Sequence, residues 1–205
     1  MKGAALHAIA ADTVFDGTVP HRQHAVVIEA GTIAAVLPRR DVPRDMPVQE
    51  LPDGAWLAPG FIDVQVNGGG DVLFNDTPTI EGIAAIVAAH RRFGTTALLP
   101  TLISDTADKM RAAAAAVQAA IPSLPGVLGI HFEGPFLAIG GAGAFTLPGD
   151  VSLLDDLLDA AGGRVAAMSI SPEVSNILLV IERLRERGVA IFMTHTRASP
   201  EETQA

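Results

Sequence analysis

One short stretch of the sequence places a histidine and a carboxylate where they could do chemistry. Residues 127–136 form an apolar, glycine-flanked run that reads as a buried strand entering a loop. In an extended chain His131 and Glu133 point to the same face. A buried carboxylate is costly without a partner, so Glu133 needs a metal ion, a basic side chain or backbone donors. The alternative is that it simply accepts hydrogen bonds from the loop that it begins.

Polar side chains also end two other apolar segments. They are Gln65 and Asn67 in an earlier segment and His195 in a later one. In a parallel sheet the carboxyl ends of all strands lie on one face, so we expect these side chains to converge with His131 and Glu133. Glutamate and histidine are common ligands of catalytic zinc, which usually takes three protein ligands and a water. By spacing alone His131 could be the third ligand. It could equally be a core histidine, with the amides bonded to backbone and His195 capping a loop.

The elements that must position these residues alternate along the chain. Strands are predicted at residues 56–67, 95–102, 127–136, 165–171 and 189–194, and helices at residues 79–93, 107–121, 153–161 and 176–187, with a glycine-rich loop at residues 140–149. A repeat of roughly 30 to 40 residues is the βαβ pattern of a parallel sheet. The fold class is therefore α/β. Only four or five units fit, whereas a closed barrel of this type needs about eight.

The first part of the chain has a different pattern. Between residues 6 and 57, short apolar runs are separated by Asp-Gly and Ala-Gly turns, which predicts a small antiparallel β unit. Residues 38–52 are rich in proline and charge and are expected to form a connecting loop. Residues 56–67 are expected to be a buried strand.

Composition excludes several classes of function. The chain has 205 residues, no cysteine, a net charge of −9, 49% hydrophobic residues and 18% charged residues. These values are typical of a compact protein without disulfide or thiolate chemistry. Lysine and arginine are not clustered, which argues against a nucleic-acid partner. No apolar stretch reaches signal-peptide or membrane length, so no membrane partner is expected and the expected location is cytoplasmic.

Four phrases, in order, resemble those of N-acetylglucosamine-6-phosphate deacetylases of the amidohydrolase superfamily. They lie at residues 58–68, 129–137, 169–173 and 194–198. The resemblance implies a (β/α)8 TIM-type barrel, incomplete in this chain, with part of a small β-sandwich domain at the N-terminus. Residues 1–57 would then belong to the sandwich, and residues 58–205 would form the first half of the barrel.

The same resemblance implies a metal site. Glu133 and His195 would be metal ligands, with Gln65, Asn67 and His131 as neighbours in the metal pocket. Many amidohydrolases carry His-x-His where this chain has amides, and amides are poorer ligands than imidazole. We therefore expect one divalent ion, zinc first, with iron or manganese as alternatives.

The activity implied is hydrolysis of the acetamide of N-acetylglucosamine 6-phosphate, a small-molecule amino-sugar phosphate, to glucosamine 6-phosphate and acetate. The catalytic aspartate and the third metal ligand are expected beyond Ala205, so no catalytic residue is assigned and the chain is expected to be a fragment. The family also implies a homodimer at full length.

Two departures leave alternatives open. In the loop after Glu133, Ala144 and Phe145 are the expected substrate contacts, but they stand where the family usually places a histidine that contacts the sugar, and phenylalanine cannot donate a hydrogen bond. Thr194 replaces a common glycine, and its hydroxyl could donate a hydrogen bond near the metal. The alternatives are a related amidohydrolase acting on another N-acyl substrate, and a truncated, inactive or binding protein.

Overall fold

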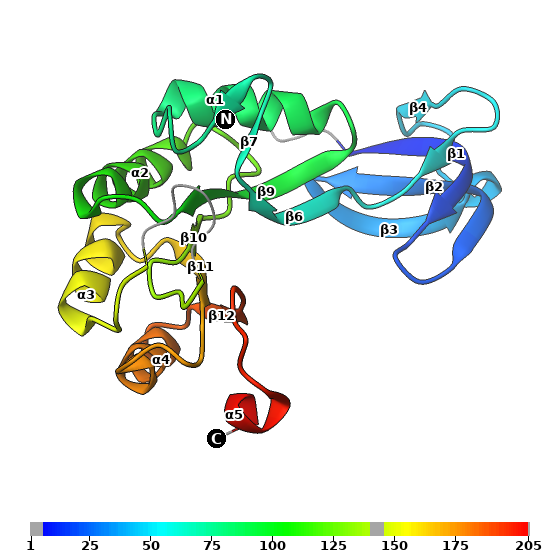
Figure 1. Ribbon diagram of the computed structural model, residues 1–205. Helices are drawn as coiled ribbons and strands as arrows, with labels where there is room; N and C mark the ends of the chain where they lie inside the picture. Colours follow the sequence, from blue (N-terminus) through cyan, green and yellow to red (C-terminus); the bar gives the residue numbers. More distant parts are fainter. Residues whose placement is uncertain (1–5, 140–145, 205) are drawn as a thin grey trace. The chain divides into compact units, whose positions relative to one another are not determined.

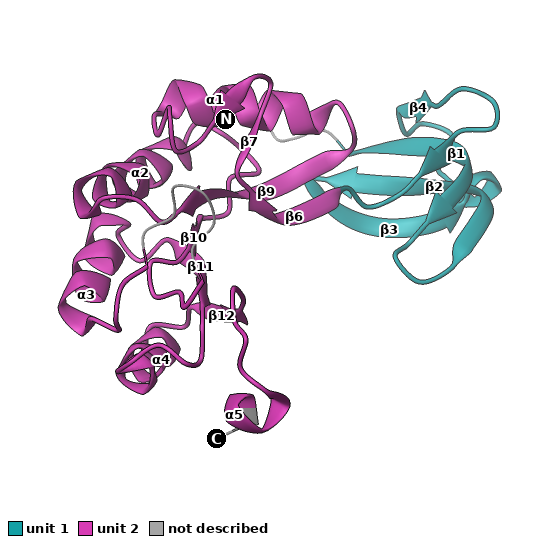
Figure 2. Ribbon diagram, in the orientation of Figure 1, with its two compact units in different colours: residues 1–60 teal, residues 61–205 magenta. Residues whose placement is uncertain are grey.

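The computed structural model describes residues 6–139 and 146–204. The chain divides into two compact units, Met1–Gly60 and Phe61–Ala205 (Figure 2). Within the described ranges, no helix is both long and apolar enough to cross a membrane.

The first unit is a five-stranded sheet. Strands β1 (His7–Phe15), β2 (Pro20–Glu29) and β3 (Thr32–Pro38) form an antiparallel meander, as predicted. Its turns fall at Gly17 and Gly31, whose φ values of 99° and 80° suit glycine. Small apolar clusters lie on this sheet, one around Ala8 and Val27 and another around Val14 and Val26.

The prediction of a loop at residues 38–52 is wrong in part. It contains the short 3-10 helix η1 (Arg39–Asp41) and the strand β4 (Val48–Glu50). Both β4 and β5 (Trp56–Leu57) pair with β1 in parallel, so the unit is not purely antiparallel. The returning chain satisfies the free edge of β1, because the Ala8 amide donates to the Pro47 carbonyl at 2.9 Å. Every residue of β4 is exposed, so its apolar pattern gave no indication of a strand.

The second unit is mixed α/β with a curled parallel sheet. The strands run in the order β12 (Ala190–Met193), β11 (Val165–Ile170), β10 (Ile130–Glu133), β9 (Thr95–Ile103) and β6 (Phe61–Val66). Figure 1 shows helices α1 (Ile80–Arg91), α2 (Ala107–Ala120), α3 (Val151–Ala160) and α4 (Ile177–Glu186) along one side of this sheet. The predicted alternation of strands and helices is confirmed.

Local sequence explains where α1, α2 and α3 begin and where α1 ends. Thr79, Thr106 and Asp150 accept hydrogen bonds from first-turn amides at the starts of α1, α2 and α3. Gly94 follows α1 with a φ of 94°, a left-handed conformation that glycine adopts at low cost. The helices bury their apolar faces against one side of the sheet, which fixes the strand ends that carry the polar side chains.

The prediction of one buried strand at residues 56–67 is wrong in part, because a strand is present at β6 but most of its residues are not buried in the described structure. Trp56 and Leu57 belong to the first unit, and in β6 only Val66 is buried. In the part of the chain that the structure describes, β6 pairs with β9 alone, and Phe61 and Ile62 are 68% and 63% exposed. After Asn67 the chain forms the small hairpin β7 (Gly68–Gly69) and β8 (Val72–Leu73). A further helix, α5 (Pro200–Gln204), follows β12.

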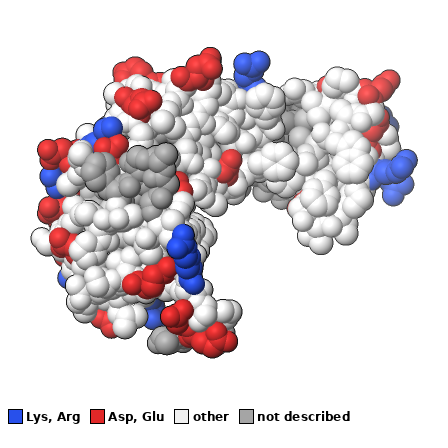
Figure 3. Space-filling view, viewed as in Figure 1, with Lys and Arg blue, Asp and Glu red and all other residues white. Residues whose placement is uncertain are grey.

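On the face drawn in Figure 3, acidic and basic side chains lie interspersed over the second unit. Several form ion pairs along the helices, such as Arg111 with Asp108 at 2.7 Å and Arg183 with Glu186 at 2.9 Å. Such exposed ion pairs contribute little to the free energy of unfolding and are typical of a solvated protein surface.

Candidate functional site

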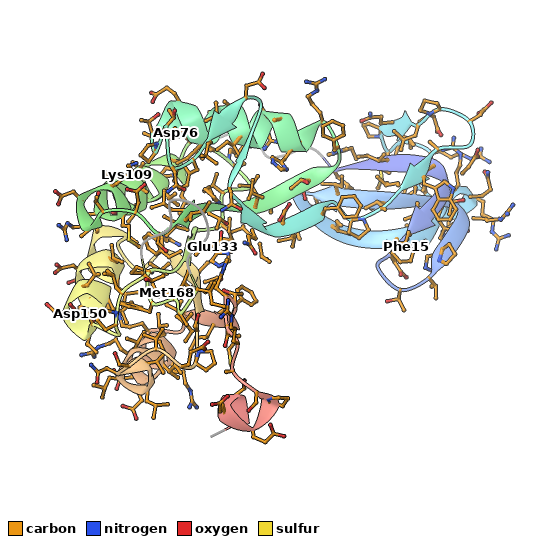
Figure 4. All side chains as sticks on the ribbon, in the orientation of Figure 1. Phe15, Asp76, Lys109, Glu133, Asp150 and Met168 are labelled. Carbon is orange, nitrogen blue, oxygen red and sulfur yellow. The ribbon has the colours of Figure 1, made fainter. Side chains whose placement is uncertain are left out.

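Glu133 lies at the carboxyl end of β10, where three segments of the second unit meet (Figure 4). Its Oε1 atom is 2.8 Å from His195 Nε2, and its Oε2 atom accepts a hydrogen bond from Asn67 Nδ2 at 3.0 Å. The predicted convergence of polar strand ends is thus observed for these three residues. Asn67 follows β6 and His195 follows β12, so the contacts join strands distant in sequence.

The alternation of side chains along β10 correctly predicted the face of the strand on which Glu133 lies. Ile130 and Phe132 are fully buried in the core beneath the helices, whereas His131 and Glu133 point to the opposite face. The Glu133 carbonyl accepts from the amide and the hydroxyl of Ser104, at 2.9 and 3.0 Å. Because β10 also pairs with both β9 and β11, the carboxylate extends from a backbone that is held on both sides.

Backbone hydrogen bonds of Asn67 and of the residue before it hold Asn67 in place. Its carbonyl accepts from the Phe74 amide at 2.8 Å, and the preceding Val66 amide donates to the buried Thr101 hydroxyl at 2.9 Å. Gln65 is exposed, and none of the side-chain hydrogen bonds found in the described ranges joins it to Glu133 or His195. Of the two predicted amides, only Asn67 reaches the carboxylate.

His131 is buried and fully engaged. Its Nδ1 lies 2.8 Å from the Val64 carbonyl, which can only accept, so Nδ1 carries the proton. Nε2 then accepts from the Ser169 hydroxyl at 2.9 Å. Burial lowers the pKa of His131, although the Val64 hydrogen bond and the charge of Glu133 act in the opposite direction. Both ring nitrogens are occupied by protein groups, which leaves neither free for a metal.

His195 lies just beyond β12 with a φ of 51°, a left-handed conformation that is uncommon for residues with a Cβ atom. The residues after it are held by Glu173, whose carboxylate accepts from the Thr196 hydroxyl and the Arg197 amide. Partial desolvation raises the pKa of Glu173, but these hydrogen bonds outweigh it and the pKa is lowered overall. The Thr194 hydroxyl oxygen is buried and has no hydrogen-bond partner in the part of the chain that the structure describes.

The donor set suits part of a divalent metal site. A carboxylate oxygen and an imidazole nitrogen approach to 2.8 Å at strand ends, and both are usual ligands of zinc, iron or manganese. Across residues 6–139 and 146–204, no three or more His, Asp or Glu residues are grouped so that they could hold a metal ion. The described residues therefore offer two candidate ligands, Glu133 and His195. Their chemistry fits a divalent ion whose remaining ligands come from elsewhere.

Two predicted substrate contacts, Ala144 and Phe145, lie outside the described residues. Conversely, no role was predicted for Ser169 and Ser171, which are fully buried beside His131 and His195. Two serines spaced two apart at the end of an apolar strand were the available indication, because such a strand rarely buries hydroxyls without partners.

Comparison with known proteins gives a consistent set of relatives. The N-acetylgalactosamine-6-phosphate deacetylase of Shewanella sp. (strain ANA-3) is 40% identical over 167 residues, covering 77% of this chain and 40% of the relative. The N-acetylglucosamine-6-phosphate deacetylase of Danio rerio is 34% identical over 157 residues, covering 69% and 38%. The crystal structure of the Mycobacterium smegmatis N-acetyl-D-glucosamine-6-phosphate deacetylase matches with a TM-score of 0.87 and 29% identity, covering 97% of this chain and 56% of that one. This chain is a homologue of the N-acetylglucosamine-6-phosphate deacetylases.

The deacetylase homologue spans about half the length of the relatives that it matches. A mutant of the Mycobacterium smegmatis enzyme, solved in complex with N-acetyl-D-glucosamine-6-phosphate, matches with a TM-score of 0.85 over 98% of this chain and 52% of that one. No model of a known protein family matches the sequence.

Proposed function

We propose that this deacetylase homologue, at the full length of its relatives, hydrolyses the acetamide of an amino-sugar phosphate, with N-acetylglucosamine 6-phosphate as the first candidate. Water adds across the C–N bond, so that the hydroxyl joins the acyl carbon and the amine leaves with a proton. The products are acetate and glucosamine 6-phosphate. The observation that carries the proposal is the meeting of Glu133, His195 and Asn67 at the carboxyl ends of parallel strands.

In this proposal Glu133 and His195 hold one divalent ion, zinc first, with iron or manganese as alternatives. The ion, when bound, would act as a Lewis acid that polarises the amide carbonyl. Asn67 orients the Glu133 carboxylate through its 3.0 Å hydrogen bond. His131 stays neutral and ties β10 to Val64 and Ser169, which keeps the strand that carries Glu133 in place.

We further propose that the second unit is part of a (β/α)8 barrel and that the first unit is part of a β-sandwich. The support is the run of parallel strands with helices on one side, together with the likeness to deacetylase structures over nearly the whole chain. A homodimer is also proposed for the full-length protein, and sedimentation of that protein would test it.

The direct test is acetate release from N-acetylglucosamine 6-phosphate by a full-length protein supplied with zinc, iron or manganese. Glu133→Gln keeps the shape of the side chain but replaces a ligand with an amide. We expect turnover and bound metal to fall by more than the roughly 10- to 100-fold that is typical when only a supporting residue of a metal site is changed. Glu182→Gln makes the same change on the exposed face of α4 and should leave both unchanged. The absence of acetate release with every metal would reject this substrate.

A second candidate substrate is N-acetylgalactosamine 6-phosphate, which is named for the 40%-identical relative from Shewanella. The two sugars differ only in the configuration at one hydroxyl. Comparison of kcat/KM for both compounds in one preparation would distinguish the two candidates. Activity on N-acyl compounds without phosphate would instead favour the broader amidohydrolase alternative, and metal binding without any turnover would favour a binding protein.

A further inference from the structure

Ser171, at the end of β11, connects the two segments that carry the proposed ligands. Its side chain is fully buried, and its Oγ accepts a hydrogen bond from the Ala138 amide at 2.9 Å. Ala138 belongs to the loop that follows Glu133. The hydroxyl proton is directed at two carbonyl oxygens, those of Thr194 at 2.9 Å and His195 at 3.0 Å. One hydroxyl therefore bonds to the loop after β10 and to the residues after β12.

The His195 backbone needs such support. A histidine at a φ of 51° lies in a sparsely populated region, which persists only when surrounding contacts hold it there. Its carbonyl has two donors, the Ser171 hydroxyl and the Ile139 amide at 3.2 Å. Ile139 again belongs to the loop after Glu133. Because Ser171 is inaccessible to solvent, water cannot replace its hydroxyl without rearrangement of the site.

We propose that Ser171 is a positioning residue that sets the distance between Glu133 and His195. The proposal rests on the metal site of the proposed function. Without the hydroxyl, the loop after Glu133 and the residues around His195 lose the contact that Ser171 gives them and keep the direct hydrogen bond from Ile139 to His195, and the His195 carbonyl loses one of its two donors. The Ser171 hydroxyl bonds to backbone groups of Ala138, Thr194 and His195, so its effect passes through the backbone that carries the imidazole.

The test compares Ser171→Ala with the unchanged protein, both at full length. Zinc affinity is measured by competition with a chelator, and the visible spectrum of the cobalt-substituted protein reports ligand geometry. We expect zinc binding to weaken by about 10- to 100-fold and the cobalt bands to change, whereas Ser171→Thr, which keeps the hydroxyl, should stay within about threefold. Val117→Ala, a fully buried change in α2, should lower the melting temperature and leave affinity and spectrum unchanged. Unchanged affinity and spectrum in Ser171→Ala would overturn the proposal.

Hydrogen exchange of backbone amides tests the proposal if the variant does not fold or if the protein binds no metal. If Ser171→Ala does not fold, zinc added to the unchanged protein should slow exchange of the Ala138 and Ile139 amides, and no slowing would refute the coupling. If the unchanged protein binds no metal, the proposed function fails. Ser171→Ala should even then speed exchange of these two amides in the metal-free protein, and equal rates would overturn the positioning role by itself.

Discussion

Replacing Asn67 with alanine removes the amide that donates to Glu133 Oε2 at 3.0 Å. A hydrogen bond to a charged group contributes about 1.5–3 kcal/mol, which corresponds to about a 10- to 150-fold change in an equilibrium constant. Two features favour the lower end of this range. His195 still contacts the other carboxylate oxygen at 2.8 Å, and the Glu133 side chain is 13% exposed, so water can partly replace the lost donor. We therefore expect zinc affinity to fall by about tenfold.

The assay is chelator competition on the full-length protein, with Asn75→Ala as the matched control. Asn75 is buried and its amide bonds to the Ile103 backbone at 2.8 and 3.0 Å, but it does not contact Glu133. Asn75→Ala should lower the melting temperature and keep the affinity for zinc. The reasoning is refuted if Asn67→Ala binds zinc as tightly as the unchanged protein, or if Asn75→Ala loses as much affinity.

Three further predictions concern stability. The His21 hydrogen bond, followed by those from the Val19 and Thr18 amides, lowers the pKa of Asp16 from 3.8 to about 2. Ionised Asp16 therefore stabilises the fold above its ordinary pKa, and this contribution is lost as the pH falls through about 2. The difference in melting temperature between the unchanged protein and Asp16→Asn should become smaller over that range. A difference that stays constant would contradict this. Asp150→Ala removes the side chain that caps α3 and should cost about 0.5–2 kcal/mol in urea unfolding, whereas Asp150→Ser should retain most of that stability; equal losses would argue against capping. Phe132→Ala should cost about 3–5 kcal/mol because the ring is fully buried, and the reasoning fails if Phe93→Ala, at an 80% exposed position, costs as much in thermal melting.

Local patterns predicted the parts of the fold that depend on local physics. Thr79 and Gly94 bracket α1 because a hydroxyl can cap first-turn amides and glycine can adopt a left-handed φ. Alternation in β10 correctly separated buried Phe132 from Glu133 on the opposite face. These features need only neighbouring residues, so a single sequence contains them.

Features that depend on residues distant in the sequence could not be predicted from local patterns. The apolar residues of β6 resemble those of a central strand, yet in the described residues Phe61 is exposed and β6 pairs with β9 alone, and local sequence does not state which strands pair. The left-handed backbone of His195 is similarly invisible in the sequence, since it depends on donors from two other segments. Convergence of Glu133 and His195 could be predicted only through the rule that parallel strands end on one face. Their metal-binding role and the complete barrel and sandwich stay predictions.

Strand β11 contributes no proposed ligand, but it separates the two strands that do. Glu133 is paired with Ser169, and Ser169 is paired with Phe192 of β12. Deleting one residue from β11 would reverse which side each later side chain faces. A scan of single-residue deletions should therefore find β11 intolerant, whereas the turn at Gly163, with open space around it, should accept changes in length. Natural variation in this protein would then accumulate in the turns and spare a strand that carries none of the chemistry.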